Sequence, residues 1–335
     1  MRFVFDRNAG SQFALSAPVA RKKMKRAALV FSAIFLIVLG VLLFTNWNSL
    51  DDGIAYLQHM ATYAPNANAP LEARGKFGFC YEFVKLRNAQ RAQFIANYLD
   101  ARGIAYQRLP IDDTFDNFFV PFAAQGPYTI FSAHYDKLFD DPDYQGASDN
   151  SAAVCMLLVA AKELKKMSPA RPVAILFTGQ EEVGLVGADA FYKYASQNNV
   201  RVADVLNFDN LGRAGIAARA SGMRGGFVFA LPLLGDFIYD GRALNAAPPL
   251  MQPDAALMQR VQRAAPVTLF DRMVATSDGT VFQARGWNAV NLSSDDMYYL
   301  EQTWHTYGDR AELWDQENFE RALELVLRYA REDAK

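Results

Sequence analysis

The stretch RPVAILFTGQEEVGL, residues 171–185, joins an apolar run to two adjacent carboxylates, and it decides the fold class. The apolar run lies between a proline and a glycine, a pattern typical of a strand that is buried on both faces of a sheet. Glu181 and Glu182 follow that strand. Neighbouring negative charges repel and burial adds to their cost, so this strand end requires a positive charge nearby.

Strand and helix patterns alternate on both sides of this stretch. Strands are predicted over 105–109, 117–122, 127–136, 171–179, 202–209 and 289–293, and helices over 81–102, 149–166, 183–197 and 316–331. This alternation predicts a single α/β domain whose central sheet is mixed, largely parallel and flanked by helices. Residues 213–275 show the weakest pattern, and ALNAAPPLMQP at 243–253 indicates a surface excursion.

The chain has 335 residues, of which 51% are hydrophobic and 21% are charged, enough for one large α/β domain or two smaller ones. Its first 26 residues hold seven Lys or Arg and one Asp, so the remainder has a formal net charge of -8. An acidic main domain disfavours nucleic acid as a partner. Cys80 and Cys155 are too few for a cysteine metal site, and both one disulfide and two buried thiols stay open.

Residues 27–44, AALVFSAIFLIVLGVLLF, form an uncharged run that is long enough to cross a bilayer as a helix. The basic cluster RKKMKR at 21–26 precedes it and is expected to stay in the cytoplasm. A cleaved signal peptide is the alternative, but the run is long for one and lacks a small-residue cleavage site. We therefore expect an uncleaved single-pass anchor, with the main domain outside the cytoplasm and in the periplasm of a bacterium.

These features give a four-part organisation. A basic cytoplasmic tail is expected at 1–26, a transmembrane anchor at 27–46, a polar connector at 47–75 and the globular domain at 76–335. The sequence gives no indication of the oligomeric state.

Polar residues stand where the predicted parallel strands end or the next helix begins. They are His134, Asp136, Asp149, Glu181, Glu182 and Asp209, and His305 follows late in the chain. Because the carboxyl ends of parallel strands meet at one edge of a sheet, these side chains are expected to lie together. Two histidines with Asp and Glu residues are the ligands of a two-metal zinc site, in which one carboxylate bridges both ions.

Each residue taken alone also has a simpler reading. Asp149 can cap its helix, Glu181 and Glu182 can favour a helix start, and Asp209 can belong to a turn. Trp304 can serve in packing or can stack on a substrate. The coincidence of these residue types at successive strand ends favours the metal site.

Six motifs, in this order, resemble those of the M28 family of metallopeptidases, which contains zinc aminopeptidases and related glutaminyl cyclases. They are AHYD at 133–136, GASDNSAAV at 146–154, GQEEVGLVGA at 179–188, NFDNLG at 207–212, SDGTVF at 277–282 and WHT at 304–306. The resemblance covers roughly residues 75–333. It implies an eight-stranded mixed sheet of the zinc-peptidase, phosphorylase–hydrolase type.

The resemblance also implies roles for individual residues. His134 and Asp209 would hold one zinc ion, Glu182 and His305 a second, and Asp149 would bridge them, with a single-ion site as the alternative. Glu181 would bind neither ion and act as general base, and Asp136 would orient His134. Asp278 would be a supporting or substrate-facing carboxylate. Gly279 and Asn288 replace a histidine and a proline that are frequent in the family, which affects the expected substrate pocket.

Three functions agree with this pattern. The first is an aminopeptidase that hydrolyses N-terminal peptide bonds, and the second is a glutaminyl cyclase that forms N-terminal pyroglutamate. The third is a non-catalytic scaffold or receptor on the same fold. The complete ligand set argues against the third, and EEVGLVGA favours the peptidase over the cyclase.

Overall fold

The structure, a computed structural model, describes residues 70–167, 169–221, 254–275, 277–296, 300 and 302–331. Within these ranges no helix is both long and apolar enough to cross a membrane. The predicted tail and anchor lie outside the described residues, as does the connector as far as residue 69.

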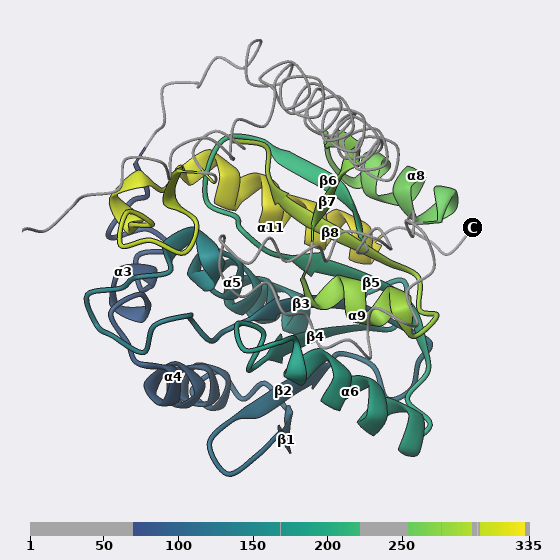
Figure 1. Ribbon diagram of the computed structural model, residues 1–335. Helices are drawn as coiled ribbons and strands as arrows, with labels where there is room; N and C mark the ends of the chain where they lie inside the picture. Colours follow the sequence, from purple (N-terminus) through teal and green to yellow (C-terminus); the bar gives the residue numbers. More distant parts are fainter. Residues whose placement is uncertain are drawn as a thin grey trace, which may run out of the picture. The chain divides into compact units, whose positions relative to one another are not determined.

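An eight-stranded mixed sheet forms the centre of the domain (Figure 1), in the order β1-β2-β4-β3-β5-β8-β6-β7. The pairs β4–β3, β3–β5, β5–β8 and β6–β7 are parallel, and the pairs β1–β2, β2–β4 and β8–β6 are antiparallel. This confirms the predicted fold class. The strands are β1 Gln107–Pro110, β2 Asp116–Pro121, β3 Tyr128–His134, β4 Val173–Thr178, β5 Val202–Phe208, β6 Ile216–Ser221, β7 Thr268–Ala275 and β8 Ala289–Ser294.

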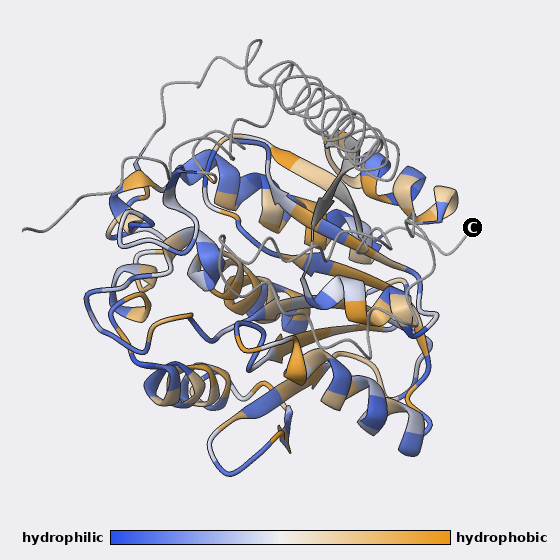
Figure 2. Cartoon of the chain, in the orientation of Figure 1, coloured by the Kyte–Doolittle hydropathy of each residue, from blue (hydrophilic) through white to orange (hydrophobic). Residues whose placement is uncertain are grey.

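Helices cover both faces of the sheet. They are α3 Cys80–Phe83, α4 Asn88–Asp100, α5 Ala152–Lys166, α6 Val186–Gln197, α8 Ala255–Ala264, α9 Asp278–Ala284 and α11 Gln316–Arg331. A π-helical turn, Ala147–Ser151, leads into α5, and a 3-10 turn, Ala311–Leu313, precedes α11. In Figure 2 the outer helices α4 and α6 alternate between hydrophilic and hydrophobic residues, as expected for helices with one face on a core.

Alternate residues of the central strands enter two different cores. In β4, Ile175 and Phe177 pack with α5 and α11, while Ala174 and Leu176 pack with Phe191 of α6. Successive side chains of a strand point to opposite faces, so a strand covered on both sides is apolar throughout. This explains why the run in 171–185 is continuous rather than alternating.

The predicted helix 81–102 is wrong in one respect, because the structure divides it into α3 and α4. Arg87 is extended, with φ -73° and ψ 161°, and its backbone N–H donates to Gln90 Oε1 at 2.9 Å. An extended residue followed three positions later by Gln is a helix-start signal. The prediction also missed α8, β6 and β7, all within the poorly patterned 213–275.

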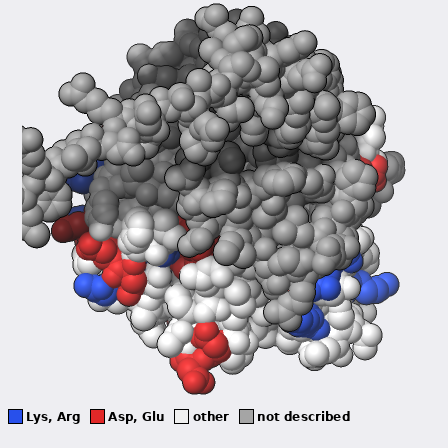
Figure 3. Space-filling model, in the orientation of Figure 1, with Lys and Arg blue, Asp and Glu red and all other residues white. Residues whose placement is uncertain are grey.

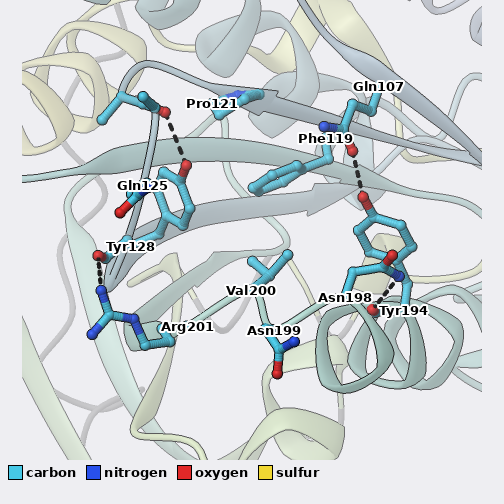
Figure 4. A pocket seen from close by; sticks show the side chains of 13 residues that line it. Gln107, Phe119, Pro121, Gln125, Tyr128, Tyr194, Asn198, Asn199, Val200 and Arg201 are labelled. Carbon is cyan, nitrogen blue, oxygen red and sulfur yellow. Dashed lines mark hydrogen bonds between the residues drawn. The ribbon is translucent and has the colours of Figure 1, made fainter.

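A hollow of about 600 Å³ lies at the amino ends of β3 and β5, away from the predicted site (Figure 4). Several of its polar side chains bond to groups of its own wall. Arg201 donates to the Gly126 carbonyl at 2.8 Å, and Tyr128 donates to the Ala123 carbonyl at 2.9 Å. No His, Cys, Asp or Glu lines it, so the hollow lacks the side chains that usually bind a metal ion.

Candidate metal centre

Three neighbouring parallel strands deliver the first residues of the site to one edge of the sheet. His134 is the last residue of β3 and pairs with Thr178, the last residue of β4. Asp209 directly follows β5, and its backbone N–H still donates to the Leu292 carbonyl of β8 at 2.9 Å. This pairing aligns the strand ends, so the residues that follow them emerge together.

Asp149 lies between the two histidines of the site. Its Oδ1 is 3.1 Å from His134 Nε2, and its Oδ2 is 3.4 Å from His305 Nε2. His134 Nε2 also lies 3.3 Å from Asp209 Oδ1, and His305 Nε2 lies 3.1 Å from Glu182 Oε2. The five residues therefore form two groups that share one carboxylate.

These separations suit zinc. A tetrahedral zinc ion with bonds of about 2.0–2.1 Å holds its ligand atoms about 3.3–3.4 Å apart. The observed distances of 3.1–3.4 Å between nitrogen and oxygen atoms match that geometry. Imidazole nitrogens with carboxylate oxygens are also a donor set that zinc prefers.

The site is acidic, and its carboxylates are buried. The Asp149 and Glu182 side chains are 5% and 3% exposed, and Glu182 Oε1 is buried with no hydrogen-bond partner. Burial, together with the charge of Asp149, raises the pKa of Glu182 to about 7. Burial lowers the pKa of His305, but hydrogen bonds to Asp149 and Glu182 outweigh it and raise that pKa to about 10. A divalent cation would satisfy the unpaired oxygen and displace these protons.

Glu181 lies beside the first group. One carboxylate oxygen of Glu181, one ring nitrogen of His134 and one carboxylate oxygen of Asp209 all lie within 4.8 Å of one another. Burial raises the pKa of Glu181 well above its ordinary value, while the nearby His134 opposes that rise. The adjacent Glu182 contacts His305, and one of its oxygens also lies within 4.8 Å of ligand atoms of His134 and Asp149.

The turn that separates these two carboxylates is held by Asp136. Its Oδ1 and Oδ2 accept hydrogen bonds from the backbone N–H groups of Glu181 and Glu182, both at 3.2 Å. His134 Nδ1 lies 3.2 Å from the Asp136 carbonyl oxygen and 3.5 Å from its Oδ1. Asp136 thus contacts the second ring nitrogen of His134, mainly through its carbonyl, and also fixes the β4 turn, a role that the sequence did not reveal.

Asp309 supports the shared carboxylate and was missed in the sequence. It is 1% exposed, and its carboxylate accepts hydrogen bonds from the backbone N–H groups of Ser148 and Asp149 at 2.8–3.0 Å. Burial raises the pKa of Asp309 to about 6, although these N–H groups lower it in part. No sequence signal identified it, because its partners are backbone atoms more than 150 positions away.

The simpler reading of Asp149 as a helix cap does not hold. The first residue of α5 is Ala152, and neither its N-cap Ser151 nor the N-cap of the preceding turn makes a side-chain cap hydrogen bond. Asp149 has φ -111° and ψ 87°, which is not helical, and its carboxylate faces the histidines. Helix 149–166 therefore starts later than predicted.

Asp278 and Trp304 differ in their exposure to solvent. Asp278 is fully buried at the start of α9, accepts a hydrogen bond from Thr178 Oγ1, and has an unpaired Oδ1. Burial raises the pKa of Asp278 to about 7. The nearby His134 lowers this pKa in part, and the charges of Asp136 and Asp209 raise it further. The Trp304 ring is 46% exposed and stacks on His305, with ring centroids 4.1 Å apart, so it is not a core residue.

The two departures from the family pattern have different consequences. A Cβ atom at Gly279 would lie 2.1 Å from Asn291 Oδ1, so this position has no room for a histidine. Asn288 donates to Asp204 Oδ1 at 2.7 Å and accepts from the Asp254 backbone N–H at 3.2 Å. It therefore fastens the start of α8 to β5 rather than contacting the acidic cluster.

Fold and site together define an α/β protein with an edge-of-sheet candidate metal centre of two histidines and several carboxylates. The family model of peptidase family M28 matches residues 121–330. The chain belongs to peptidase family M28.

Curated relatives match shorter segments. A vacuolar membrane protease of Vanderwaltozyma polyspora is 32% identical over 91 residues, which are 27% of this chain and 9% of that protein. An aminopeptidase of Pseudomonas aeruginosa is 31% identical over 113 residues, which are 33% of this chain and 17% of that protein. The chain thus aligns with less than a fifth of the length of either relative.

Solved structures share the fold at low identity. Legionella pneumophila LapA aminopeptidase superimposes with a TM-score of 0.59 at 15% identity, covering 78% of this chain and 69% of that one. A Zn-dependent exopeptidase of Parabacteroides distasonis gives 0.56 at 18%, covering 79% and 100%. Tannerella forsythia glutaminyl cyclase gives 0.57 at 15%, also covering 79% and 100%. The fold is therefore common to peptidases and cyclases.

Proposed function

We propose that this chain is a zinc-dependent aminopeptidase that removes N-terminal residues from peptides. The observation that carries the proposal is the position of Asp149, whose two oxygens each face a different histidine. A carboxylate placed in this way can bridge two ions. His134 and Asp209 would hold one zinc ion, and Glu182 and His305 the other. The shared fold of the Zn-dependent exopeptidase of Parabacteroides distasonis supports zinc as the metal.

The zinc ions and the protein side chains would have different roles in the reaction. When bound, zinc lowers the pKa of water and polarises a carbonyl. Glu181, beside His134 and Asp209, would accept the proton of the attacking water and donate it to the leaving amine. Burial raises its pKa, and a raised pKa favours proton uptake by a general base.

Access to the site supports a substrate that is itself a chain end. His305 is 33% exposed in its side chain while His134 is 1% exposed, so the cluster opens on the His305 side and is closed behind His134. Trp304 stands half-exposed at that opening. In the described part of the chain, the cluster is open to a peptide terminus on the His305 side, which agrees with an exopeptidase.

A glutaminyl cyclase is the second candidate, and Trp304 is the observation that favours it. A half-exposed indole stacked beside His305 offers a surface to a small planar group such as a side-chain amide. This reaction expels ammonia and closes a ring, whereas the peptidase releases an amino acid.

A paired assay separates the two candidates. Purified protein is expected to hydrolyse aminoacyl chromogenic substrates, and a zinc chelator should abolish this activity. Incubation with peptides that begin with glutamine should yield free amino acid and no pyroglutamate. Ammonia release with an intact peptide bond would instead assign the cyclase reaction.

We further propose that residues 27–46 anchor the protein in a membrane, with the peptidase domain outside the cytoplasm. The support is the uncharged run preceded by five basic residues. In spheroplasts of a bacterial host, protease added outside should digest the domain of the full chain. Protection of the domain until the cells are lysed would contradict the proposal.

A further inference from the structure

Arg91 of α4 is a fully buried cation near the candidate metal centre. In the described part of the chain, its guanidinium donates to carbonyl oxygens and to one hydroxyl rather than to a carboxylate. Burial lowers the pKa of Arg91 to about 10, so the guanidinium is still charged at neutral pH. A buried charge without an ion partner is costly, so the hydrogen bonds that it makes must offset the cost of its burial.

Its guanidinium joins the two segments that carry the deepest site residues. Nη1 donates to the carbonyl of Tyr135, the residue between His134 and Asp136, at 3.1 Å. Nη2 donates to the Gln145 carbonyl at 2.7 Å and to Ser151 Oγ at 2.8 Å. Gln145 precedes the turn that carries Asp149, and Ser151 is the last residue of that turn.

Ser151 extends this connection around the turn. Its Oγ donates to the Gly146 carbonyl at 2.6 Å, and its backbone N–H donates to the same carbonyl at 3.1 Å. The turn is therefore closed on itself and then fastened by Arg91 to the end of β3. Asp309 holds the other side of the same turn through the Ser148 and Asp149 N–H groups.

We propose that Arg91 is a positioning residue for the metal centre: it sets the spacing between His134 and Asp149 and thereby strengthens zinc binding. This inference rests on the proposed metal site. The planar guanidinium reaches both segments with two nitrogens in a fixed geometry, whereas a lysine ammonium is a single flexible point. The positive charge of Arg91 also attracts the carboxylates of Asp136 and Glu182 electrostatically.

A purely structural role makes a different prediction. Arg91 also lies over the Phe83 ring, with Cζ 4.9 Å from the ring centroid, so it contributes to packing between α3 and α4. If packing were its only role, replacement would lower the stability of the fold and leave the zinc affinity of the folded protein unchanged.

The test compares Arg91→Lys with Arg260→Lys. Arg260 is a second inward-facing arginine, which joins α8 to Asp204 of β5 at 2.7 Å and to Tyr329 at 3.0 Å, away from the acidic cluster. Zinc affinity is measured by competition with a chromophoric chelator, and the fold is checked by circular dichroism. We expect Arg91→Lys to bind zinc about 10- to 100-fold more weakly, the range for partners behind metal ligands, and Arg260→Lys to match the wild type.

Equal zinc affinity in folded Arg91→Lys and wild type would overturn the proposal. If Arg91→Lys does not fold, Ser151→Ala is measured instead, because it removes one Arg91 contact without creating a new buried charge. Weaker zinc binding by Ser151→Ala supports the role of Arg91, and unchanged zinc binding overturns it. The two proposals can also fail separately. If these variants bind zinc more weakly but the wild-type protein hydrolyses no peptide, the proposed activity is overturned and the role of Arg91 stands.

Discussion

Glu181→Gln is expected to slow peptide hydrolysis by a factor on the order of 10² to 10⁴ while zinc stays bound. The substitution keeps the size of the side chain but removes its ability to accept a proton. The Glu181 carboxylate lies near His134 and Asp209, but no ion pair joins it to either histidine, unlike Glu182 with His305. The kcat for an aminoacyl chromogenic substrate and the zinc content of the same preparation measure both quantities.

Glu182→Gln is the matched control for that experiment. Both variants change one carboxylate to an amide in adjacent residues held by the same Asp136 side chain. Glu182 Oε2 lies 3.1 Å from His305, so its amide should weaken zinc binding, and the loss of activity should follow the loss of metal. Two variants with equal zinc loss, or a Glu181→Gln variant with nearly normal kcat, would contradict the division of roles between these neighbours.

Asp149→Asn is expected to weaken zinc binding by more than about 100-fold, beyond the range for residues that only support a ligand. Asparagine keeps the shape and the backbone contact to Asp309, but its neutral amide presents one oxygen instead of two charged ones. Both groups of the site use this carboxylate, so both should lose affinity together. Zinc titration of the metal-free protein measures the effect.

Asp143→Asn is the control for Asp149→Asn. Asp143 lies in the same connection between β3 and the Asp149 turn but is exposed, and Figure 3 shows acidic groups of this kind on the visible surface. It should bind zinc like the wild type. If Asp149→Asn binds zinc with the affinity of the wild type, Asp149 is not a metal ligand, even if the substitution changes the stability of the fold.

The continuous apolar run of β4 and the polar residues after β3, β4 and β5 were sufficient to predict the α/β class and to predict that these polar side chains lie together at one edge of the sheet. Buried parallel strands have a strong sequence pattern, and their ends must meet at one edge. By contrast, β6, with the sequence IAARAS, has one β-branched residue among three alanines, and alanine is depleted in strands. It becomes a strand by pairing with β7 and β8, a tertiary effect that local sequence does not encode.

The supporting residues were harder to predict than the candidate ligands. Asp309 and Arg91 act through backbone atoms of distant segments, and neither has a spacing or a motif that marks it. Asp136 was identified as a partner of His134, but its hydrogen bonds to the β4 turn depend on the alignment of two strands. The residue types that bind a metal are visible in a sequence, whereas the contacts that position them emerge only when the chain is folded.

Anomalous X-ray scattering at the zinc edge, from crystals of the protein grown with zinc, tests the central claim most directly. We predict one peak bounded by His134, Asp149 and Asp209 and a second bounded by Asp149, Glu182 and His305. A single peak at either position would retain the site and reduce the metal count to one. The absence of anomalous density at both positions, or zinc bound only elsewhere on the chain, would contradict the account.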